Sequence, residues 1–388
     1  MLLRWGIILR GQSTSKVQHM KVNGIANRSI RVNDNGWAVD IIDQTLLPHQ
    51  FSIRTLNCME DAAEAICTMR VRGAPLIGAT AAYGIALAMK KDPGTTHLLE
   101  VADALLLTRP TAVNLRWALD RMTTTLVPLE PDQRMRRAYD IAETLCDEDV
   151  AINSSIGDHG LALINELWNS RNNDSGEFHI LTHCNAGWLA TVDWGTALAP
   201  IYKAHDSGIP VHVWVDETRP RNQGAALTAW ELASHGVPHD VIVDNAGGHL
   251  MQHGLVDLCI TGTDRTAASG DVCNKIGTYL KALAAYDNNV PFYVALPGPT
   301  IDWQASDGVT EIPIEERDPT EITHIPGITS DGRTEQVRIT PEGVTARNFA
   351  FDVTPARLVT GLITERGICG ASRPGLEGLY PEQSGNET

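Results

Sequence analysis

The chain has 388 residues, 47 acidic and 31 basic side chains, and a formal net charge of −16. This charge argues against a nucleic-acid partner, because phosphate backbones are bound by clustered lysine and arginine side chains. The length and a hydrophobic content of 43% predict two domains with a sizeable core. The seven cysteines are scattered and never form CxxC, so they indicate neither a disulfide framework nor a zinc ribbon, and a reducing cytoplasm fits best.

The N-terminal residues 1–19 carry basic side chains around a short apolar patch, without the apolar core or the cleavage site of a signal peptide. We expect a disordered extension here, with Met20 as an alternative first residue. The uncharged stretch 73–89 consists mainly of glycine, alanine and other small residues. It predicts a packed core helix rather than a membrane span.

The segment 20–150 is predicted to form an N-terminal domain that is mostly helical after a small β start. Helical patterns cover 61–70, 75–91 and 109–122, and Pro110 suits the first turn of the last one. Further helices between 131 and 167 are expected to join this domain to the next.

From residue 178 onward, short apolar runs alternate with helical patterns. The apolar runs are 178–184, 211–217, 240–245, 256–264 and 291–296, and the helical patterns include 195–208, 224–236 and 274–287. Such alternation predicts an α/β fold in which helices cover both faces of a parallel sheet. We assign this second domain to 151–369. The tail 370–388 is rich in glycine, proline and polar residues, and we expect it to be disordered.

Ligands of such sheets bind at the carboxyl ends of the strands, where Cys184, Glu217, Asp244 and Asp264 close their apolar runs. Cys184 enters a tight turn that would expose its side chain at this edge, which makes it a candidate base or nucleophile. A single cysteine at a strand end is also common as a small core residue. His183 should point to the opposite face, because side chains alternate along a strand.

Asp264 leads into a glycine-containing loop in which Asp271 and Asn274 could cap the following helix and Lys275 would begin it. A helix start with a lysine suits a phosphate. The other interpretation is a helix cap beside a surface lysine. The spacing does not match GxxxxGK[ST], so nucleotide hydrolysis is not predicted.

An anionic substrate would need cations in this acidic chain, and arginines before three candidate binding segments could supply them. They are Arg70 with Arg72, Arg109, and Arg219 with Arg221. Each could also be a surface charge. His249 and His253 lie four residues apart without an acidic general base between them, so no metal site is predicted.

Five ordered segments together make the chain recognisable. They are VRGAPLIGATAAYG, RPTAVNLRWALDRM, LTHCNAG, DETRPRNQGA and TDRTAASGDVCNKIGTY. In these segments the chain resembles the methylthioribose-1-phosphate isomerase family, over about Val22 to Glu365. The wider superfamily includes ribose-1,5-bisphosphate isomerase. It also includes the regulatory subunits of the guanine-nucleotide exchange factor that acts on a eukaryotic initiation factor.

The resemblance implies a helical bundle followed by a Rossmann-like catalytic domain, a homodimer, and no metal or organic cofactor. The implied reaction converts the phosphosugar 5-methylthioribose 1-phosphate into 5-methylthioribulose 1-phosphate in methionine salvage. Cys184 would be catalytic and Asp264 would be the proton donor. The implied substrate contacts are Arg72, Gly73, Ala74, Arg109, Gln223, Asn274 and Lys275.

Thr263, Cys273 and the bulky Trp188, Asp193 and Trp194 depart from the family pattern. They leave 5-deoxyribose 1-phosphate open as the substrate. Trp188 and Trp194 would make a neutral pocket for the 5-substituent, which disfavours a 5-phosphate. A non-catalytic regulatory subunit remains the other alternative, although binding alone requires neither Cys184 nor Asp264. The hydrogen on C2 could move as a proton or as a hydride.

Overall fold

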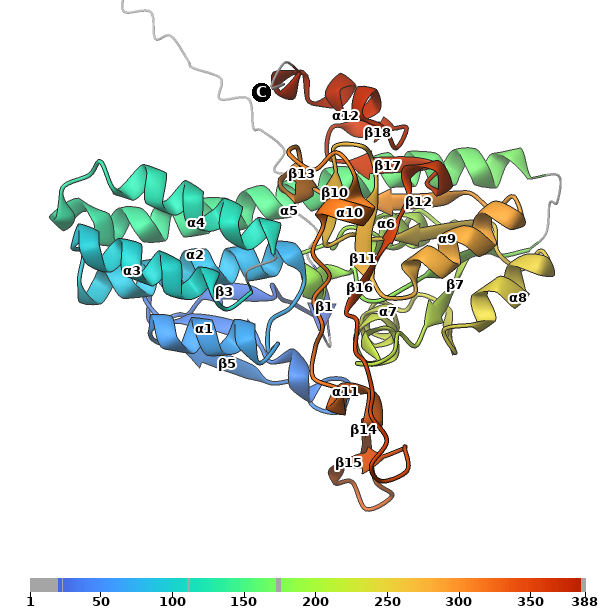
Figure 1. The fold of residues 1–388 in the computed structure, drawn as a ribbon, viewed down its shortest axis with the longest axis horizontal. Coiled ribbons are helices and arrows are strands. Elements are labelled where there is room, and N and C mark those ends of the chain that lie inside the picture. Colours follow the sequence, from blue (N-terminus) through green and yellow to red (C-terminus); the bar gives the residue numbers. More distant parts are fainter. Residues whose placement is uncertain (1–19, 23, 110–111, 172–175, 385–388) are drawn as a thin grey trace, which may run out of the picture.

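The computed structural model describes residues 20–384, except residue 23, residues 110–111 and residues 172–175. The predicted extension 1–19 and the predicted helix start at Pro110 therefore lie outside the described residues. Helices of the N-terminal half lie on one side of the molecule, and the large sheet lies on the other (Figure 1).

The described chain begins with short strands. β1 and β2 pair with each other, and β3, β4 and β5 form an antiparallel sheet in that order. The bounds are Lys21–Val22 (β1), Ile25–Ala26 (β2), Ile30–Val32 (β3), Val39–Ile42 (β4) and Ile53–Leu56 (β5), with a 3-10 turn at Gln44–Leu46 (η1). The predicted small β start is thus present.

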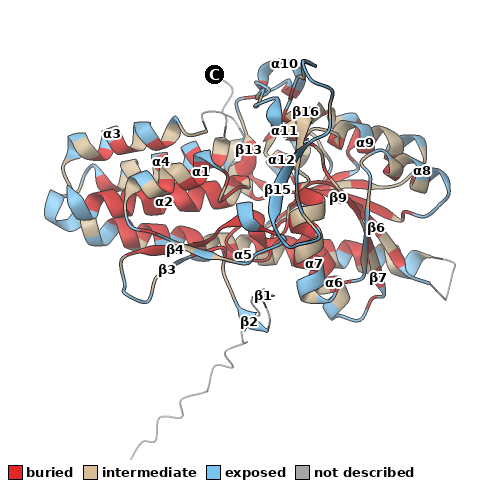
Figure 2. Cartoon of the chain, turned by 90° about the horizontal axis from the view of Figure 1, so that it is seen from below, coloured by how far each residue is buried: buried red, intermediate tan, exposed pale blue. Residues whose placement is uncertain are grey.

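Five helices follow: Met59–Cys67 (α1), Ala74–Lys91 (α2), Thr95–Leu106 (α3), Val113–Leu126 (α4) and Pro131–Ser170 (α5). α2 is buried along nearly its whole length, as the prediction of a core helix required (Figure 2). None of the described helices is long and apolar enough to cross a membrane. The sequence patterns had not indicated α3.

α5 is a single helix of 40 residues. The predicted domain boundary between residues 150 and 151 falls inside it, and the helices expected between 131 and 167 are this one helix. Its packing is continuous: buried residues from Ala138 to Ile164 line one side of the helix and belong to one hydrophobic core. That core also contains Leu76 of α2 and Ile180 of the large sheet.

The large sheet has seven strands in the order β18-β17-β12-β9-β6-β7-β8, parallel except for β18. This confirms the predicted α/β class. The strands are Phe178–Thr182 (β6), Val211–Asp216 (β7), His239–Ile242 (β8), Leu258–Thr261 (β9), Phe292–Ala295 (β12), Gly361–Thr364 (β17) and Gly367–Cys369 (β18). The connecting helices are Leu198–Asp206 (α6), Ala229–His235 (α7), Ala246–Gln252 (α8) and Thr278–Asp287 (α9), with turns of 3-10 helix at Trp188–Ala190 (η2) and π-helix at Gly224–Thr228 (η3).

The two faces of this sheet bury alternate side chains in separate clusters. Ile180 and Ile260 pack with residues of α5 and α6, whereas Leu181 and Cys259 pack with residues of α8 and α9. The near-continuous apolar runs of the sequence arise because both faces are covered.

A second sheet has the order β13-β10-β11-β16. Its strands are Arg265–Ala267 (β10), Val272–Lys275 (β11), Ile301–Asp302 (β13) and Phe351–Thr354 (β16). The prediction that Lys275 begins a helix is therefore wrong. Asn274 and Lys275 lie in β11, paired with Asp352 and Phe351 of β16, and α9 begins only at Thr278.

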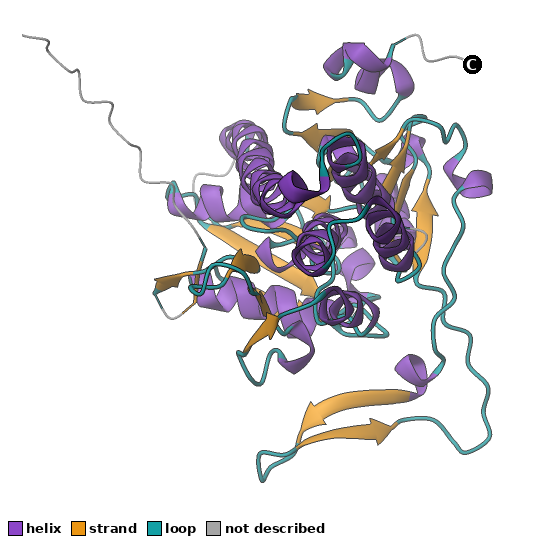
Figure 3. Ribbon diagram, turned by 90° about the vertical axis from the view of Figure 1, so that its left-hand side faces the viewer, coloured by secondary structure: helices purple, strands orange, loops and turns teal. Residues whose placement is uncertain are grey.

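A hairpin of His324–Ile328 (β14) and Thr334–Arg338 (β15) stands apart from the rest of the molecule (Figure 3). Short helices precede it at Gly308–Glu311 (α10) and Thr320–Thr323 (α11). Further 3-10 turns lie at Gly298–Thr300 (η4), Ala356–Leu358 (η5) and Pro381–Gln383 (η6).

The expectation of a disordered tail is wrong for residues 370–384, where Arg373–Leu379 forms α12. The Ser372 side chain accepts a hydrogen bond from the N–H of Gly375, and Leu376 and Tyr380 are buried against the large sheet. Burial of these two side chains stabilises the folded tail. The composition of the segment, which is averaged over all its residues, does not show this contribution.

Candidate active site

Cys184 lies just beyond the end of β6 in a left-handed backbone conformation, with φ of 64°. Its N–H donates to Oγ1 of Thr218 over 2.8 Å, and its thiol donates to Oε1 of Gln223 over 3.4 Å. The predicted tight turn is present, but the side chain is only 8% exposed. Cys184 is therefore buried and lines a cavity at this edge of the sheet.

This cavity collects residues from chain segments that are far apart in the sequence. It is lined by Arg72, Gly73 and Ala74, by Cys184, and by Asp264 with Asn274. The carboxyl end of the parallel sheet thus meets the start of α2 and the second sheet here. Six of the nine predicted site residues share one cavity wall.

Asp264 follows β9, and its N–H donates to the carbonyl of Cys273 over 3.0 Å. Its side chain also lines a second cavity, whose apolar wall includes Ile77, Ile312 and Phe351. Burial raises the pKa of the Asp264 carboxyl, against the opposing charges of Lys275, Arg109 and Arg72. A buried carboxyl with a raised pKa is suited to donate a proton.

Cys184 and Lys275 also influence each other's protonation. Burial raises the pKa of the Cys184 thiol, while the charges of Arg72 and Lys275 lower it. Burial lowers the pKa of the Lys275 ammonium, while Cys184 and Asp264 raise it. The Lys275 ammonium also lies 4.7 Å from the centre of the Phe351 ring. A thiol, a carboxyl and an amine are therefore electrostatically coupled within one buried site.

Arg72 reaches across the domain contact to Asn185, the residue after Cys184. Its guanidinium donates to Oδ1 of Asn185, and over 2.6 Å to the Asn185 carbonyl. Gly73 follows with φ of 96° and ψ of 134° and precedes α2. A Cβ at Gly73 would lie 2.4 Å from the carbonyl oxygen of Ala190, so only glycine allows this approach.

Arg109 does not line the cavity around Cys184, but it lines the second cavity beyond Asp264. One guanidinium nitrogen lies 3.3 Å from Oε2 of Glu315, and the buried Nε has no hydrogen-bond partner. Arg317 bridges Glu315 and Glu321. Sequence reasoning missed Glu315 and Arg317, because nothing in their local sequence links them to Arg109.

Gln223 reaches Cys184 through the turn after β7, where Thr218 has φ of 68° and Asn222 has φ of 53°. The other arginines predicted as candidates are engaged elsewhere. Arg219 donates to the carbonyl of Ile322, Arg221 pairs with Glu321, and Arg70 pairs with Asp43 and Glu64.

Asn274 and Lys275 approach the site from β11, not from a helix start. The amide of Asn274 donates to Oγ1 of Thr278 over 3.0 Å. Phosphate binding at this point would therefore rely on these two side chains, and the predicted contribution of free helical N–H groups is not available.

Glu231 organises the turn after Cys184, although no sequence motif pointed to it. Its buried carboxylate accepts from the side chains of Asn185 and Tyr202 and from the N–H groups of Trp188 and Leu189. Burial raises the pKa of Glu231, and these four donors lower it. The single carboxylate of Glu231 thus holds the turn that follows Cys184.

The prediction that Trp188 and Trp194 line a substrate pocket is wrong. Trp188 is 1% exposed and packs against Trp230, and Trp194 lies in the core beside the ammonium of Lys203. Neither side chain lines the cavities around Cys184 and Asp264. Both tryptophans are buried in the main hydrophobic core.

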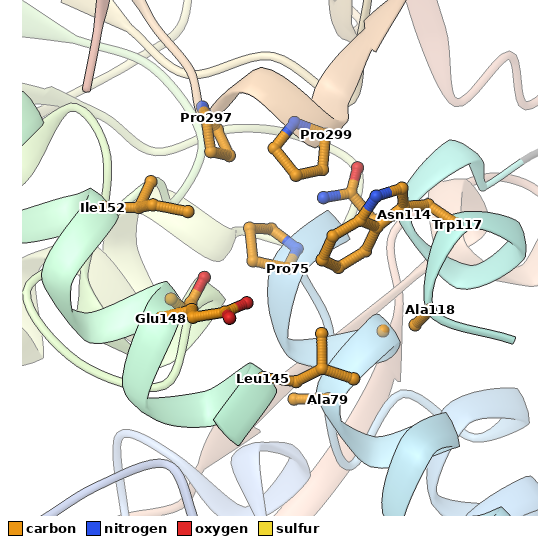
Figure 4. Close-up of a pocket in the computed structure, with 12 residues that line it drawn as sticks. Pro75, Ala79, Asn114, Trp117, Ala118, Leu145, Glu148, Ile152, Pro297 and Pro299 are labelled. Atoms are coloured by element: carbon orange, nitrogen blue, oxygen red, sulfur yellow. The ribbon is translucent and has the colours of Figure 1, made fainter. Parts of the chain in front are cut away.

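One further cavity lies on the other side of Pro75 (Figure 4). Pro297 and Pro299, from the segment after β12, face Asn114 and Trp117 of α4 across it. Oγ1 of Thr300 donates to Oδ1 of Asn114 over 3.1 Å. This hydrogen bond links α4 to η4, the turn that follows β12 of the large sheet.

His183, Asp216 and Asp244 are the group of metal-ligand type that the described residues bring together, within 4.8 Å. The ammonium of Lys281 already lies 3.1 Å from Oδ2 of Asp216, in the place that a cation would take. His249 and His253 form a ring contact on the surface. The residue set does not fit a metal ion.

Comparison with known proteins identifies the family of the chain. Residues 70–371 match the model of the initiation factor 2 subunit family, and the chain belongs to this family. It is 64% identical over 368 residues to the methylthioribose-1-phosphate isomerase of Rhodospirillum rubrum, covering 94% of both chains. It is 63% identical over 365 residues to the protein of that name from Paramagnetospirillum magneticum, covering 94% of this chain and 100% of the relative.

Two solved structures are similar over nearly the whole chain. The crystal structure of 5-methylthioribose 1-phosphate isomerase from Pyrococcus horikoshii OT3 has 38% identity and a TM-score of 0.78, covering 92% of this chain and 96% of that one. The structure of translation initiation factor eIF-2B, subunit delta, from A. fulgidus has 38% identity and a TM-score of 0.74, covering 92% and 99%. The family resemblance seen in the five sequence segments is confirmed.

Proposed function

We propose that the chain is an aldose–ketose isomerase that converts 5-methylthioribose 1-phosphate into 5-methylthioribulose 1-phosphate, a step of methionine salvage. The observation that carries the proposal is the cavity that Cys184, Asp264 and Arg72 line together. The names of the similar proteins from Rhodospirillum rubrum and Paramagnetospirillum magneticum support it.

Asp264 supplies the acid that this substrate requires. The phosphate on the anomeric oxygen prevents spontaneous ring opening, so the ring oxygen must be protonated as its bond to C1 breaks. The raised pKa of Asp264, caused by burial, keeps a proton on the carboxyl for this step. The C2 hydroxyl later loses its proton as the ketone forms, and this proton restores Asp264.

Cys184 acts on the hydrogen of C2. As a thiolate it takes this hydrogen as a proton, which leaves an enediol, and the thiol, after exchange of its proton with the solvent, returns a proton at C1. In the other route the hydrogen moves from C2 to C1 as a hydride, and Cys184 stabilises the cationic intermediate. Turnover in D₂O separates the routes, since solvent deuterium at C1 of the product requires proton transfer.

Three cations lie around Asp264 and are suited to hold the phosphate. Arg72 and Arg109 each line a pocket together with Asp264, and the charges of Lys275, Arg109 and Arg72 all lower the pKa of this carboxyl, which supports their assignment to the phosphate. Arginine binds phosphate through two parallel hydrogen bonds, and a fixed phosphate orients C1 and C2 between acid and thiol. We assign Gly73, Ala74, Gln223 and Asn274 to the same substrate site.

The apolar wall beyond Asp264, with Ile77, Ile312 and Phe351, supports a 5-substituent without charge. The test is turnover by the purified protein of three 1-phosphates that carry methylthio, hydrogen or phosphate at C5. We expect the methylthio compound to react with the highest kcat/KM. Higher activity on the 5-deoxy sugar or the bisphosphate would reassign the substrate, and absence of all turnover would favour a regulatory subunit.

We also propose a homodimer in the cytoplasm. All seven cysteines are free, which is consistent with a reducing compartment. Large apolar side chains are exposed in and just after the edge strand β8, at Val241 and Val243, and on α9, at Leu280 and Tyr286, and a second copy would cover such side chains. Light scattering should give twice the chain mass of 42.2 kDa, whereas a single chain mass would exclude the dimer.

A further inference from the structure

His183 precedes Cys184 directly, and the reaction steps above give it no task. Its side chain is buried and makes two hydrogen bonds. Nδ1 lies 2.8 Å from Oδ2 of Asp216, at the end of β7, and Nε2 lies 2.9 Å from the carbonyl of Ile276, just beyond β11. The ring therefore bridges the large sheet and the second sheet beside the candidate site.

The partners of this ring define its protonation. A carbonyl oxygen can only accept, so Nε2 carries a proton. Oδ2 of Asp216 also contacts the ammonium of Lys281 at 3.1 Å, which indicates an ionised carboxylate that accepts from both sides. Nδ1 therefore carries a proton as well, and the ring is an imidazolium.

Charged groups face the ring from the elements packed against it. Lys281 of α9 and the imidazolium are positive. Asp216, at the end of β7, and Asp244, after β8, are negative, and Oδ1 of Asp244 lies 3.9 Å from Nδ1. Asp352 of β16 adds a third carboxyl, which accepts from the N–H groups of Gly277 and Tyr279. A buried cation is tolerable here because carboxylates surround it.

The hydrogen bond of the ring with Asp216 connects it, through Thr218, to Cys184. The carbonyl of Asp216 accepts the hydroxyl of Thr218 over 2.9 Å, and the same hydroxyl oxygen accepts the N–H of Cys184 over 2.8 Å. The N–H of Thr218 is held by Asp244. These contacts fix both Cys184 and Thr218 in left-handed conformations that side chains rarely adopt.

The hydrogen bond of the ring with the carbonyl of Ile276 connects it to Lys275. Ile276 directly follows Asn274 and Lys275, so its carbonyl sets the position of the end of β11. We propose that His183 is a positioning residue that, as an imidazolium, sets the distance between the thiol of Cys184 and the ammonium of Lys275. This proposal rests on the proposed function, because it concerns the residues of that same site.

Two substitutions test the two hydrogen bonds of the His183 ring one at a time. In His183→Asn the amide nitrogen lies near the position of Nδ1 and keeps the contact with Asp216, whereas in His183→Gln it lies near Nε2 and keeps the contact with Ile276. His179→Gln is the matched control, since His179 lies on β6, the strand that leads to His183, stacks on Trp214 and does not line the cavity. Melting temperatures confirm that each variant is folded.

The first readout needs no turnover: the rate at which iodoacetamide alkylates Cys184, with inorganic phosphate as the protecting anion. We expect His183→Asn to keep the alkylation rate but to need about tenfold more phosphate for protection, and to raise KM similarly. We expect His183→Gln to change the alkylation rate and to lower kcat by about tenfold or more, with phosphate protection retained. His179→Gln should behave as wild type.

Equal losses of thiol reactivity and phosphate protection in both variants would overturn the proposal and leave His183 as a packing residue. If neither variant folds, histidine-labelled wild-type protein decides: the ¹⁵N spectrum should show the buried ring with both nitrogens protonated at neutral pH, and a neutral tautomer refutes the proposal. If the wild-type protein lacks isomerase activity but the two variants still differ in this way in alkylation and phosphate protection, only the proposed function is refuted.

Discussion

Gly73→Ala tests the close contact that places Arg72 beside Cys184. The new Cβ would lie 2.4 Å from the carbonyl oxygen of Ala190 and 2.6 Å from its Cα, and backbone atoms cannot rotate away. Overpacking of this kind costs about 1–3 kcal/mol, and the backbone conformation of Gly73 adds about 1–3 kcal/mol for any other residue. Reduced freedom of the unfolded chain returns about 0.4–1 kcal/mol, so the net loss is about 1–6 kcal/mol.

Urea denaturation measures this loss as a fall in the free energy of unfolding. Gly236→Ala is the matched control, because Gly236 has φ of 82° at the end of α7 and its Cβ would meet nothing within 4 Å. It should cost about 1–2 kcal/mol, from the left-handed conformation alone. If Gly73→Ala costs no more than this control, the contact between α2 and the turn after Cys184 is not as described. If α2 shifts to relieve the overlap, KM should rise more than kcat falls.

Three further substitutions test the roles assigned in the site. Cys184→Ala should abolish turnover and cost about 1 kcal/mol of stability, since only one sulfur leaves a small buried site; near-normal turnover would remove its catalytic role. Asp264→Asn should lower kcat by about 10²–10⁴-fold, with substrate binding retained. The raised pKa of Asp264 means that the folded wild type loses stability as pH rises from about 3.9, the unfolded value, through the folded pKa, so the Asn variant should gain stability over wild type across that range. Thermal melts at a series of pH values check this, and parallel curves would contradict it. Arg109→Lys should raise KM, because lysine cannot form the planar two-bond contact with phosphate, and unchanged kinetic constants would show that Arg109 serves only its pair with Glu315.

The strand ends were the part of the site that sequence could predict. Cys184 and Asp264 each close an apolar run, and parallel strands bring such ends to one edge of the sheet. Lys275 shows where this reasoning fails. The pattern from Asn274 onward resembles a helix start, but pairing with Phe351, far along the chain, makes it a strand. Local propensity was overridden by a tertiary contact that no local pattern encodes.

Other parts of the site have no local signal at all. Glu231 lies on the apolar side of a helix, and Glu315 precedes an exposed hairpin, yet both hold residues of the site. The tail offers a different lesson. Ser372 followed by Pro374 is a recognisable helix start, but the overall composition of residues 370–388 suggested disorder. Composition describes an average over the segment, whereas the helix docks through two particular side chains, Leu376 and Tyr380, which are buried.

The 40 residues of α5 make this helix about 60 Å long, and it contacts α2 and α4 at one end and α6 and β17 at the other. Hinge rotation of the helical part against the sheet part would have to bend a continuous helix inside a shared core, which close packing opposes. We therefore expect the gate for substrate and product to be local. The segment 312–323, which carries Glu315 and lies over the cavity beside Asp264, is the element whose loops can open without disturbing α5. The rate of product release should then respond to changes in this segment and remain insensitive to changes along the helix.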